Sequence, residues 1–182
     1  DYAGAHAGMG SALFKLGRYD DALASQKRAL AINPDDPQTH FNMGTVYLKK
    51  ELPQLAVASY REAVRLNPAD TDSYNNMGNA YNVMGNFDEA LECCRKAIEL
   101  NPDNDEAWRN LTSTTKLAML QKNLRTPEDF FDLSGLGQAI RSSRHFAMYE
   151  YALGSFRPHE ADASYLIALD SMPKPSPTRQ PA

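Results

Sequence analysis

The sequence predicts an all-α protein built from repeated pairs of helices. The first observation is an internal period, because residues 3–36, 37–70 and 71–104 align without a gap. The second is that each unit holds two runs of helical periodicity, at about 40–50 and 53–66 in the second unit. The third is where these runs break: at Leu16-Gly17, at Met84-Gly85 and at three Asn-Pro pairs. Glycine allows a left-handed turn and proline cannot continue a helix, so each unit reads as helix, tight turn, helix, short turn.

The composition narrows the function before any motif is considered. The 182 residues are 42% hydrophobic and 23% charged, and the net charge of −4 is small and negative, so we expect no nucleic-acid partner. No apolar run reaches the roughly 18–20 residues of a membrane span. Cys93 and Cys94 are adjacent and point about 100° apart on a helix, so they cannot readily bridge. We therefore expect packed thiols in a reducing, cytoplasmic compartment rather than a disulfide or a metal site.

Small and large residues recur at fixed offsets within the three units. The second unit has His40, Met43, Gly44, Tyr47, Ala56, Tyr60, Ala63 and Pro68; the first has His6, Met9, Gly10, Leu13, Ala22, Gln26, Ala29 and Pro34; the third has Tyr74, Met77, Gly78, Tyr81, Ala90, Cys94, Ala97 and Pro102. Glycine and alanine suit places where two helices cross closely, with large residues beside them. This pattern resembles the tetratricopeptide repeat (TPR) family, and the resemblance implies a right-handed α-solenoid.

The fourth unit, about 105–141, is divergent. Residues 105–121 read like another first helix, with Trp108 and Leu111 in the slots for large residues. Thr112 takes the place of the close-contact glycine, so we expect a looser crossing there. Residues 124–140 would form the matching second helix, weakened by two glycines.

A fifth, divergent unit is predicted over residues 142–173. The stretch from His145 matches the stretch from His40 at eleven offsets, although Tyr149 replaces the glycine that corresponds to Gly44. We therefore predict one TPR array over residues 1–173, with three regular and two divergent repeats. Residues 174–182, KPSPTRQPA, are rich in proline and polar residues, which favours a disordered tail.

Asparagines are concentrated in the stretch NNMGNAYN, residues 75–82, although asparagine is a poor helix former. On a helical wheel Asn75, Asn76, Asn79 and Asn82 fit an arc of about 120°. We therefore expect one continuous amide stripe. Asn42, Asn76 and Asn110 are also spaced by one period each, so they occupy equivalent positions on successive first helices.

The resemblance implies that first helices line the concave wall of the array. A row of amides there, each with donor and acceptor, could pair with the backbone of an extended peptide. This is similar to the asparagine ladder in the TPR region of O-GlcNAc transferases. The alternative is that these amides only cap or bridge neighbouring repeats. The candidate peptide-binding residues are Asn42, Asn76, Asn110, Asn75, Asn79, Asn82, Phe41, Thr45, Lys49 and Arg109, where Phe41 is either an apolar anchor or an inter-repeat filler.

Other chemistries are disfavoured. TPR domains that hold chaperone tails use a carboxylate clamp of Lys, Arg and Asn, but the corresponding positions here are Ala7, Ser11, Asn42, Asp72 and Asn76, so we do not expect such tails as partners. The histidines of the first two units share one structural slot at about 10 Å spacing, too far apart for one metal ion. No pair of nucleophile and base is evident, so we expect no enzyme activity and no cofactor.

The sequence therefore favours a non-catalytic protein–protein interaction module that binds an extended peptide or a partner's segment. Two alternatives stay open. The chain could be the substrate-recruiting arm of an enzyme, such as a glycosyltransferase, whose catalytic domain lies elsewhere. It could also be a structural scaffold that docks in a large assembly.

Overall fold

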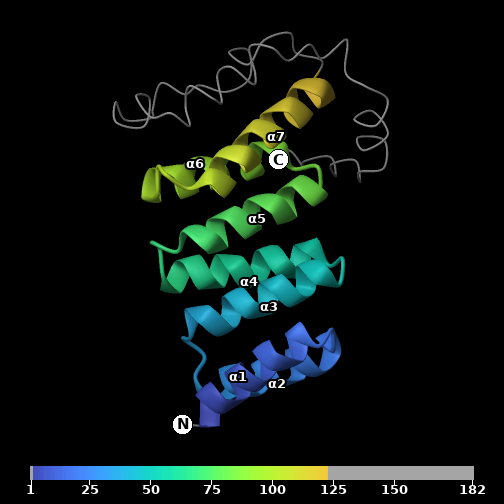
Figure 1. Ribbon diagram of the computed structural model, residues 1–182, viewed down its shortest axis with the longest axis vertical. Coiled ribbons are helices and arrows are strands. Elements are labelled where there is room, and N and C mark those ends of the chain that lie inside the picture. Colours follow the sequence, from blue (N-terminus) through green and yellow to red (C-terminus); the bar gives the residue numbers. More distant parts are fainter. Residues whose placement is uncertain (1, 123–182) are drawn as a thin grey trace, which may run out of the picture. The chain divides into compact units, whose positions relative to one another are not determined.

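The computed structural model describes residues 2–122, and this range is entirely helical apart from short turns (Figure 1). Its helices are α1 (Tyr2–Lys15), α2 (Tyr19–Ile32), α3 (Pro37–Lys49), α4 (Pro53–Leu66), α5 (Thr71–Val83), α6 (Phe87–Leu100) and α7 (Asp105–Lys122). The predicted all-α class with helix pairs is confirmed. The helix predicted at 124–140, the fifth repeat at 142–173 and the tail at 174–182 lie outside the described residues.

Two compact units make up the chain, and the division between them falls after Ala80, within α5. The first unit holds α1 to α4 and most of α5. The second holds the end of α5 together with α6 and α7. In the first unit the two helices of each repeat contact one another, α1 with α2 and α3 with α4. In the second unit α6, the second helix of the third repeat, contacts α7, the first helix of the fourth. In the first unit α3 also packs on α2 and α1.

The helix ends follow local chemistry. α4 spans the residues predicted for it, 53–66, whereas α3 begins at Pro37 rather than near His40. Asp36 explains the earlier start, because its carboxylate accepts from the backbone N–H of Gln38 at 3.3 Å and from the hydroxyl of Thr39. Proline suits the first helical position, where no N–H is needed.

The tight turn inside each pair needs one residue in the left-handed region. Gly17 and Gly85 supply it with φ of 73° and 75°. At the equivalent position of the second repeat, one period from each of them, stands Glu51 with φ of 59°. A side chain is disfavoured in this conformation, so the second repeat carries strain that the other two avoid.

Buried residues from adjacent repeats form the core of the first unit. Ala22 and Leu23 of α2 cluster with Met43 and Val46 of α3. Within the second repeat, Gly44 faces the Tyr60 ring so closely that a Cβ at Gly44 would lie 2.6 Å from the ring carbon Cε1. Only glycine fits beneath this fully buried tyrosine, which explains the expected close crossing of small and large residues.

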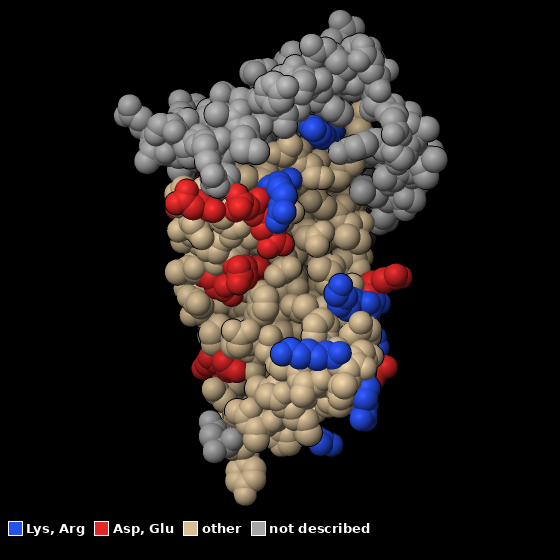
Figure 2. Space-filling model, in the orientation of Figure 1, with Lys and Arg blue, Asp and Glu red and all other residues tan. Residues whose placement is uncertain are grey.

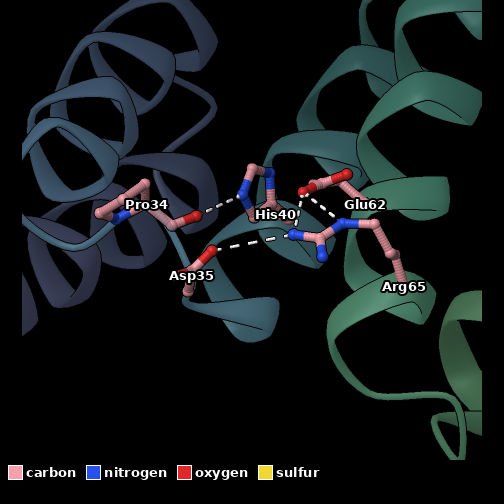
Figure 3. Close-up of polar contacts among 5 residues, drawn as sticks. All are labelled: Pro34, Asp35, His40, Glu62 and Arg65. Atoms are coloured by element: carbon pink, nitrogen blue, oxygen red, sulfur yellow. Dashed lines mark hydrogen bonds and ion pairs between the residues drawn. The ribbon is translucent and has the colours of Figure 1, made fainter.

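Polar contacts hold the turn between the first two repeats against α4 (Figure 3). His40 Nε2 lies 2.9 Å from the carbonyl oxygen of Pro34. The Arg65 guanidinium reaches Asp35 at 3.7 Å and Glu62 at 2.6 Å, and its hydrogen bond to Glu62 lowers the pKa of the Glu62 carboxyl. Histidine therefore serves the turn here, in keeping with its interpretation as a structural residue.

In the second unit, a ring nitrogen again contacts a proline carbonyl oxygen before a first helix, but the residue is different. Trp108, at the position equivalent to His40, donates from Nε1 to the carbonyl oxygen of Pro102 at 2.8 Å. The fully buried residues Leu91 and Ile98 of α6 and Leu111 and Met119 of α7 form its apolar interior. A contact from a ring nitrogen to a proline carbonyl is thus a recurrent way of fixing the start of a first helix.

Candidate functional site

One face of the first helices gathers most of the candidate binding residues of the first unit. On α3, Gln38, Asn42, Thr45 and Lys49 follow one another at spacings of four, three and four, which places them within about 60° on the helix. The same four positions are Gly4, Gly8, Ser11 and Lys15 on α1, and the first three of them are Asp72, Asn76 and Asn79 on α5. We call this set of residues the first-helix face.

Asn42 is the best-anchored amide on the first-helix face. Its Nδ2 donates to the hydroxyl of Ser11 on α1 at 3.3 Å, and its Oδ1 accepts from Nε2 of Gln38 at 3.1 Å. Ser11 in turn donates to the carbonyl oxygen of Ala7 at 3.2 Å. These bonds fix the orientation of the half-buried Asn42 side chain. They use one of its two donor hydrogens and one of its two acceptor lone pairs.

On α1, next to Asn42, the first-helix face carries two glycines, Gly4 and Gly8. A Cβ added at Gly4 or at Gly8 would meet no atom within 4 Å. Glycine lets another chain approach the helix backbone closely. The anchored amide of Asn42 therefore stands next to a stretch of α1 without side chains.

Phe41 and Thr45 are tied to the interior of the second repeat. The Phe41 ring is half-buried and lies 5.8 Å from the ring of Tyr60. Tyr60 donates its hydroxyl to Thr45 Oγ1 at 3.2 Å, and Thr45 donates to the carbonyl oxygen of Phe41. Burial raises the pKa of Tyr60 to about 12, so its hydroxyl stays protonated and keeps its role as donor.

The asparagines of α5 do not form one exposed stripe. Asn79 is exposed, and the half-buried Asn76 donates from Nδ2 to the carbonyl oxygen of Asp72 at 3.1 Å. Asn75 is only 2% exposed, and both polar atoms of its amide lack a hydrogen-bond partner among the described residues. The expectation of a continuous stripe is therefore wrong at Asn75, because neighbouring structure covers this part of the predicted arc.

Three candidate residues belong to the second unit and are described there by themselves. Asn82 donates from Nδ2 to Thr114 Oγ1 of α7 at 2.7 Å, so its amide links the end of α5 to α7. Asn110 is half-buried and Arg109 is exposed on α7. The position of Asn110 relative to Asn42 and Asn76 stays a prediction.

The first unit separates its charges along the first helices. Acidic side chains gather at the edge where α3 and α5 begin, and Lys and Arg predominate at the opposite edge, where α1 and α3 end (Figure 2). At the acidic edge Asp36 and Asp70 are occupied in capping, since each accepts from the backbone two residues on. At the basic edge Lys15 and Lys49 are exposed. Lys15 was missed from the sequence, although its position one period before Lys49 could have indicated it.

The described residues favour no other chemistry. Cys93 and Cys94 are buried and form no disulfide, and burial raises the pKa of Cys94 to about 12, so the Cys94 thiol is a poor nucleophile. Within residues 2–122, no His, Cys, Asp and Glu side chains gather in threes that could hold a metal ion. None of the helices α1 to α7 combines the length and apolar character that a membrane crossing needs.

Solved structures share this architecture. The first TPR of Spaghetti (RPAP3), bound to the HSP90 peptide SRMEEVD, is 26% identical with a TM-score of 0.63, covering 64% of this chain and 93% of that one. The first TPR domain of human RPAP3 is 25% identical with a TM-score of 0.64, covering 67% and 96%. The Arabidopsis OM64 TPR domain, at 20% identity and a TM-score of 0.62 over 63% and 95%, shows the fold alone.

Family models give the same result from the sequence. None of the curated proteins matches this chain. Residues 71–104 match the model described as "Tetratricopeptide repeat", and residues 10–51 and 54–85 match the one described as "TPR repeat". Together with the helix pairs of the first unit, these matches show that the chain belongs to the tetratricopeptide repeat family.

Proposed function

We propose that this protein is a non-catalytic interaction module that binds an extended peptide segment on the first-helix face of its first unit. Asn42 and Asn76 would each pair with a peptide group of the ligand. The observation that carries the proposal is the anchoring of Asn42, whose amide is held between Ser11 and Gln38 and still keeps one donor hydrogen and one lone pair. A pre-oriented amide loses little freedom when it binds, which favours affinity.

The surroundings of Asn42 support the same function. The bare backbone of α1 at Gly4 and Gly8 leaves room for a ligand main chain beside this amide. Contacts to peptide groups demand little of the ligand's side chains, so a range of sequences would be accepted. The similarity to a domain of Spaghetti (RPAP3) that is bound to a peptide agrees with a peptide ligand.

The contact set is smaller than the sequence predicted. We leave out Asn75, which is buried, and Asn82, whose amide serves α7. The two proposed contacts, Asn42 and Asn76, are flanked by Asn79, Thr45 and Lys49. Phe41 would contribute only the exposed part of its ring. Asn110 and Arg109 would extend the site on the second unit and are to be tested separately.

The test is selection followed by calorimetry. A random library of short peptides, acetylated and amidated at their ends, would be selected for binding, and the best binders titrated into wild type and variants. Asn42→Ala together with Asn76→Ala should weaken binding about thirtyfold, since each of the two lost hydrogen bonds is worth about 1 kcal/mol and about 1.4 kcal/mol is tenfold. Asn33→Ala, a change of the same kind at the end of α2, should leave affinity unchanged.

Circular dichroism of each variant would separate binding from folding, because both Asn→Ala changes lie on helices and alanine favours a helix. If no peptide is selected, or if the double variant binds as well as wild type with the same helix content, the proposed amide contacts do not exist. In the same assay, Asn110→Ala alone tests whether the second unit takes part.

A further inference from the structure

Two lysines at equivalent positions stand at one end of the first-helix face. Lys15 is in the last turn of α1 and Lys49 in the last turn of α3, one period apart. Both are exposed, and neither has a carboxylate partner among the described residues. Their cationic neighbours differ, because Lys50 pairs with Asp20 and Arg18 with Asp21. Of these four cations, Lys15 and Lys49 are the two for which the described residues provide no ion pair.

The lysines share a stripe with the proposed amide contacts. Lys49 follows Asn42 by seven positions, which is two helical turns and about 10 Å along the same side of α3. Lys15 follows Gly8 by the same interval on α1. The bond from Asn42 to Ser11 shows that these two stretches lie side by side. A chain crossing α1 and α3 over the amide would thus run parallel to the line joining the two lysines.

The spacing of packed helices sets the spacing of the charges that the ligand needs. Neighbouring helix axes lie about 8–10 Å apart, so the bases of the two lysines are separated by about that distance. An extended chain in the polyproline II conformation advances about 3.1 Å per residue with three residues per turn. Residues three apart on such a chain point the same way at about 9 Å, which matches the lysines.

We propose that Lys15 and Lys49 make this site selective for extended segments that carry two acidic side chains three residues apart. The proposal rests on the proposed function and names the class of its ligand. None of the five positions that correspond to a carboxylate clamp holds Lys or Arg here, so we expect Lys15 and Lys49 to bind side-chain carboxylates within a segment rather than the carboxylate of a chain terminus. At the opposite end of the first-helix face, the exposed Asp72 would repel an acidic side chain of the ligand. The acidic side chains of a bound segment should therefore point toward the two lysines.

The first test is the peptide selection itself. Binders from the random amidated library should be enriched in Glu or Asp pairs three residues apart. For one binder, Gln at both positions should lower affinity about fivefold, because exposed ion pairs are individually weak. The advantage of the Glu peptide should shrink as salt is raised, since surface charges are screened within about 8 Å at physiological ionic strength.

Variants assign the selectivity to the two lysines. Lys15→Gln with Lys49→Gln should lower the affinity for the Glu peptide about fivefold and leave that for the Gln peptide unchanged. The matched control, Lys27→Gln with Arg28→Gln on α2, changes net charge equally and should have no effect. The reversal Lys15→Glu with Lys49→Glu should make the site prefer Lys at the two peptide positions.

The outcomes separate the two proposals. If peptides bind through Asn42 and Asn76 but show no acidic pair, or if both double variants lower affinity alike, the lysine selectivity is wrong and the peptide site stands. If no peptide binds, both proposals fall.

Discussion

Replacing glycine by alanine at two positions of the first unit should have opposite effects on stability. Alanine in a helix is favoured over glycine by about 0.5–1 kcal/mol. At Gly8 of α1 the added Cβ would meet no atom within 4 Å, so Gly8→Ala should stabilise the protein by about that amount. At Gly44 of α3 the Cβ would lie 2.6, 2.8 and 2.8 Å from three carbons of the Tyr60 ring.

The Tyr60 ring has little freedom to move away. It is fully buried, lies 5.8 Å from the ring of Phe41 and donates its hydroxyl to Thr45. Overpacking of this kind costs about 1–3 kcal/mol, and contacts this short point to the upper end. After the helical gain of about 1 kcal/mol, Gly44→Ala should destabilise by about 2 kcal/mol. The same chemical change at two sites would thus differ by about 3 kcal/mol in the free energy of unfolding.

Urea unfolding followed by circular dichroism would measure both variants. A double-mutant cycle tests the cause: in a Tyr60→Cys background, with the residue that the third repeat has at this position, Gly44→Ala should no longer destabilise. The ring-clash argument would be refuted if Gly44→Ala were as stable as Gly8→Ala, or if its effect were the same with and without Tyr60.

The buried residues and the turn support three more predictions. Gln26→Met should raise the urea midpoint, because both polar atoms of this buried amide lack a hydrogen-bond partner among the described residues, and each such atom costs about 1–3 kcal/mol. The control is Gln54→Met, at an exposed position. A lower urea midpoint for Gln26→Met would show that the amide has hydrogen-bond partners. Glu51→Gly should stabilise by several tenths of a kcal/mol, because relief of the left-handed strain at φ of 59° outweighs the added chain entropy; Gly17→Ala should do the reverse. Burial raises the folded-state pKa of Cys94 from 9.0 to about 12, so the stability that the protonated thiol contributes is complete below pH 9 and is lost as pH rises toward 12. At pH 10 about 1.4 kcal/mol of the free energy of unfolding should be gone. This loss should disappear in Cys94→Ala, and an equal fall of stability with pH in the two proteins would contradict it.

Much of the fold could be predicted because it depends on local chemistry that recurs. Glycine in the left-handed turns, proline after each pair and the regular period are visible in the sequence. The close crossing at Gly44 was also predictable, because glycine recurs at this offset as Gly10 and Gly78, although the residue at the offset of Tyr60 varies. The early start of α3 at Pro37 was missed because a cap by Asp36 outweighs the hydrophobic period at a helix end. The strained turn at Glu51 was missed because the residue itself gives no turn signal.

The candidate site was harder to predict than the fold, and Asn75 shows why. A helical wheel gives the direction of a side chain from its own axis, and Asn75 falls within the polar arc. Whether that direction is open depends on the neighbouring helices, and the structure leaves the side chain only 2% exposed. The bond from Asn42 to Ser11 was missed for the same reason, since it joins side chains on two different helices. Period and residue type therefore locate a binding face, while its open and closed positions are decided by packing.

The first unit contains polar residues at both open and closed positions, and those at closed positions lower its stability. Gln26 and Asn75 occupy slots that Tyr60 and Phe41 fill in the second repeat, and both amides are buried without partners among the described residues. Both side chains are buried, so contact with a ligand at the surface does not explain their cost in stability. Asn42 differs, because its half-buried amide is supported by two hydrogen bonds and keeps part of its surface open. Recognition of a peptide backbone requires an amide that is both held by hydrogen bonds and accessible to the ligand. This requirement separates the proposed contacts from other buried amides that share the repeat spacing.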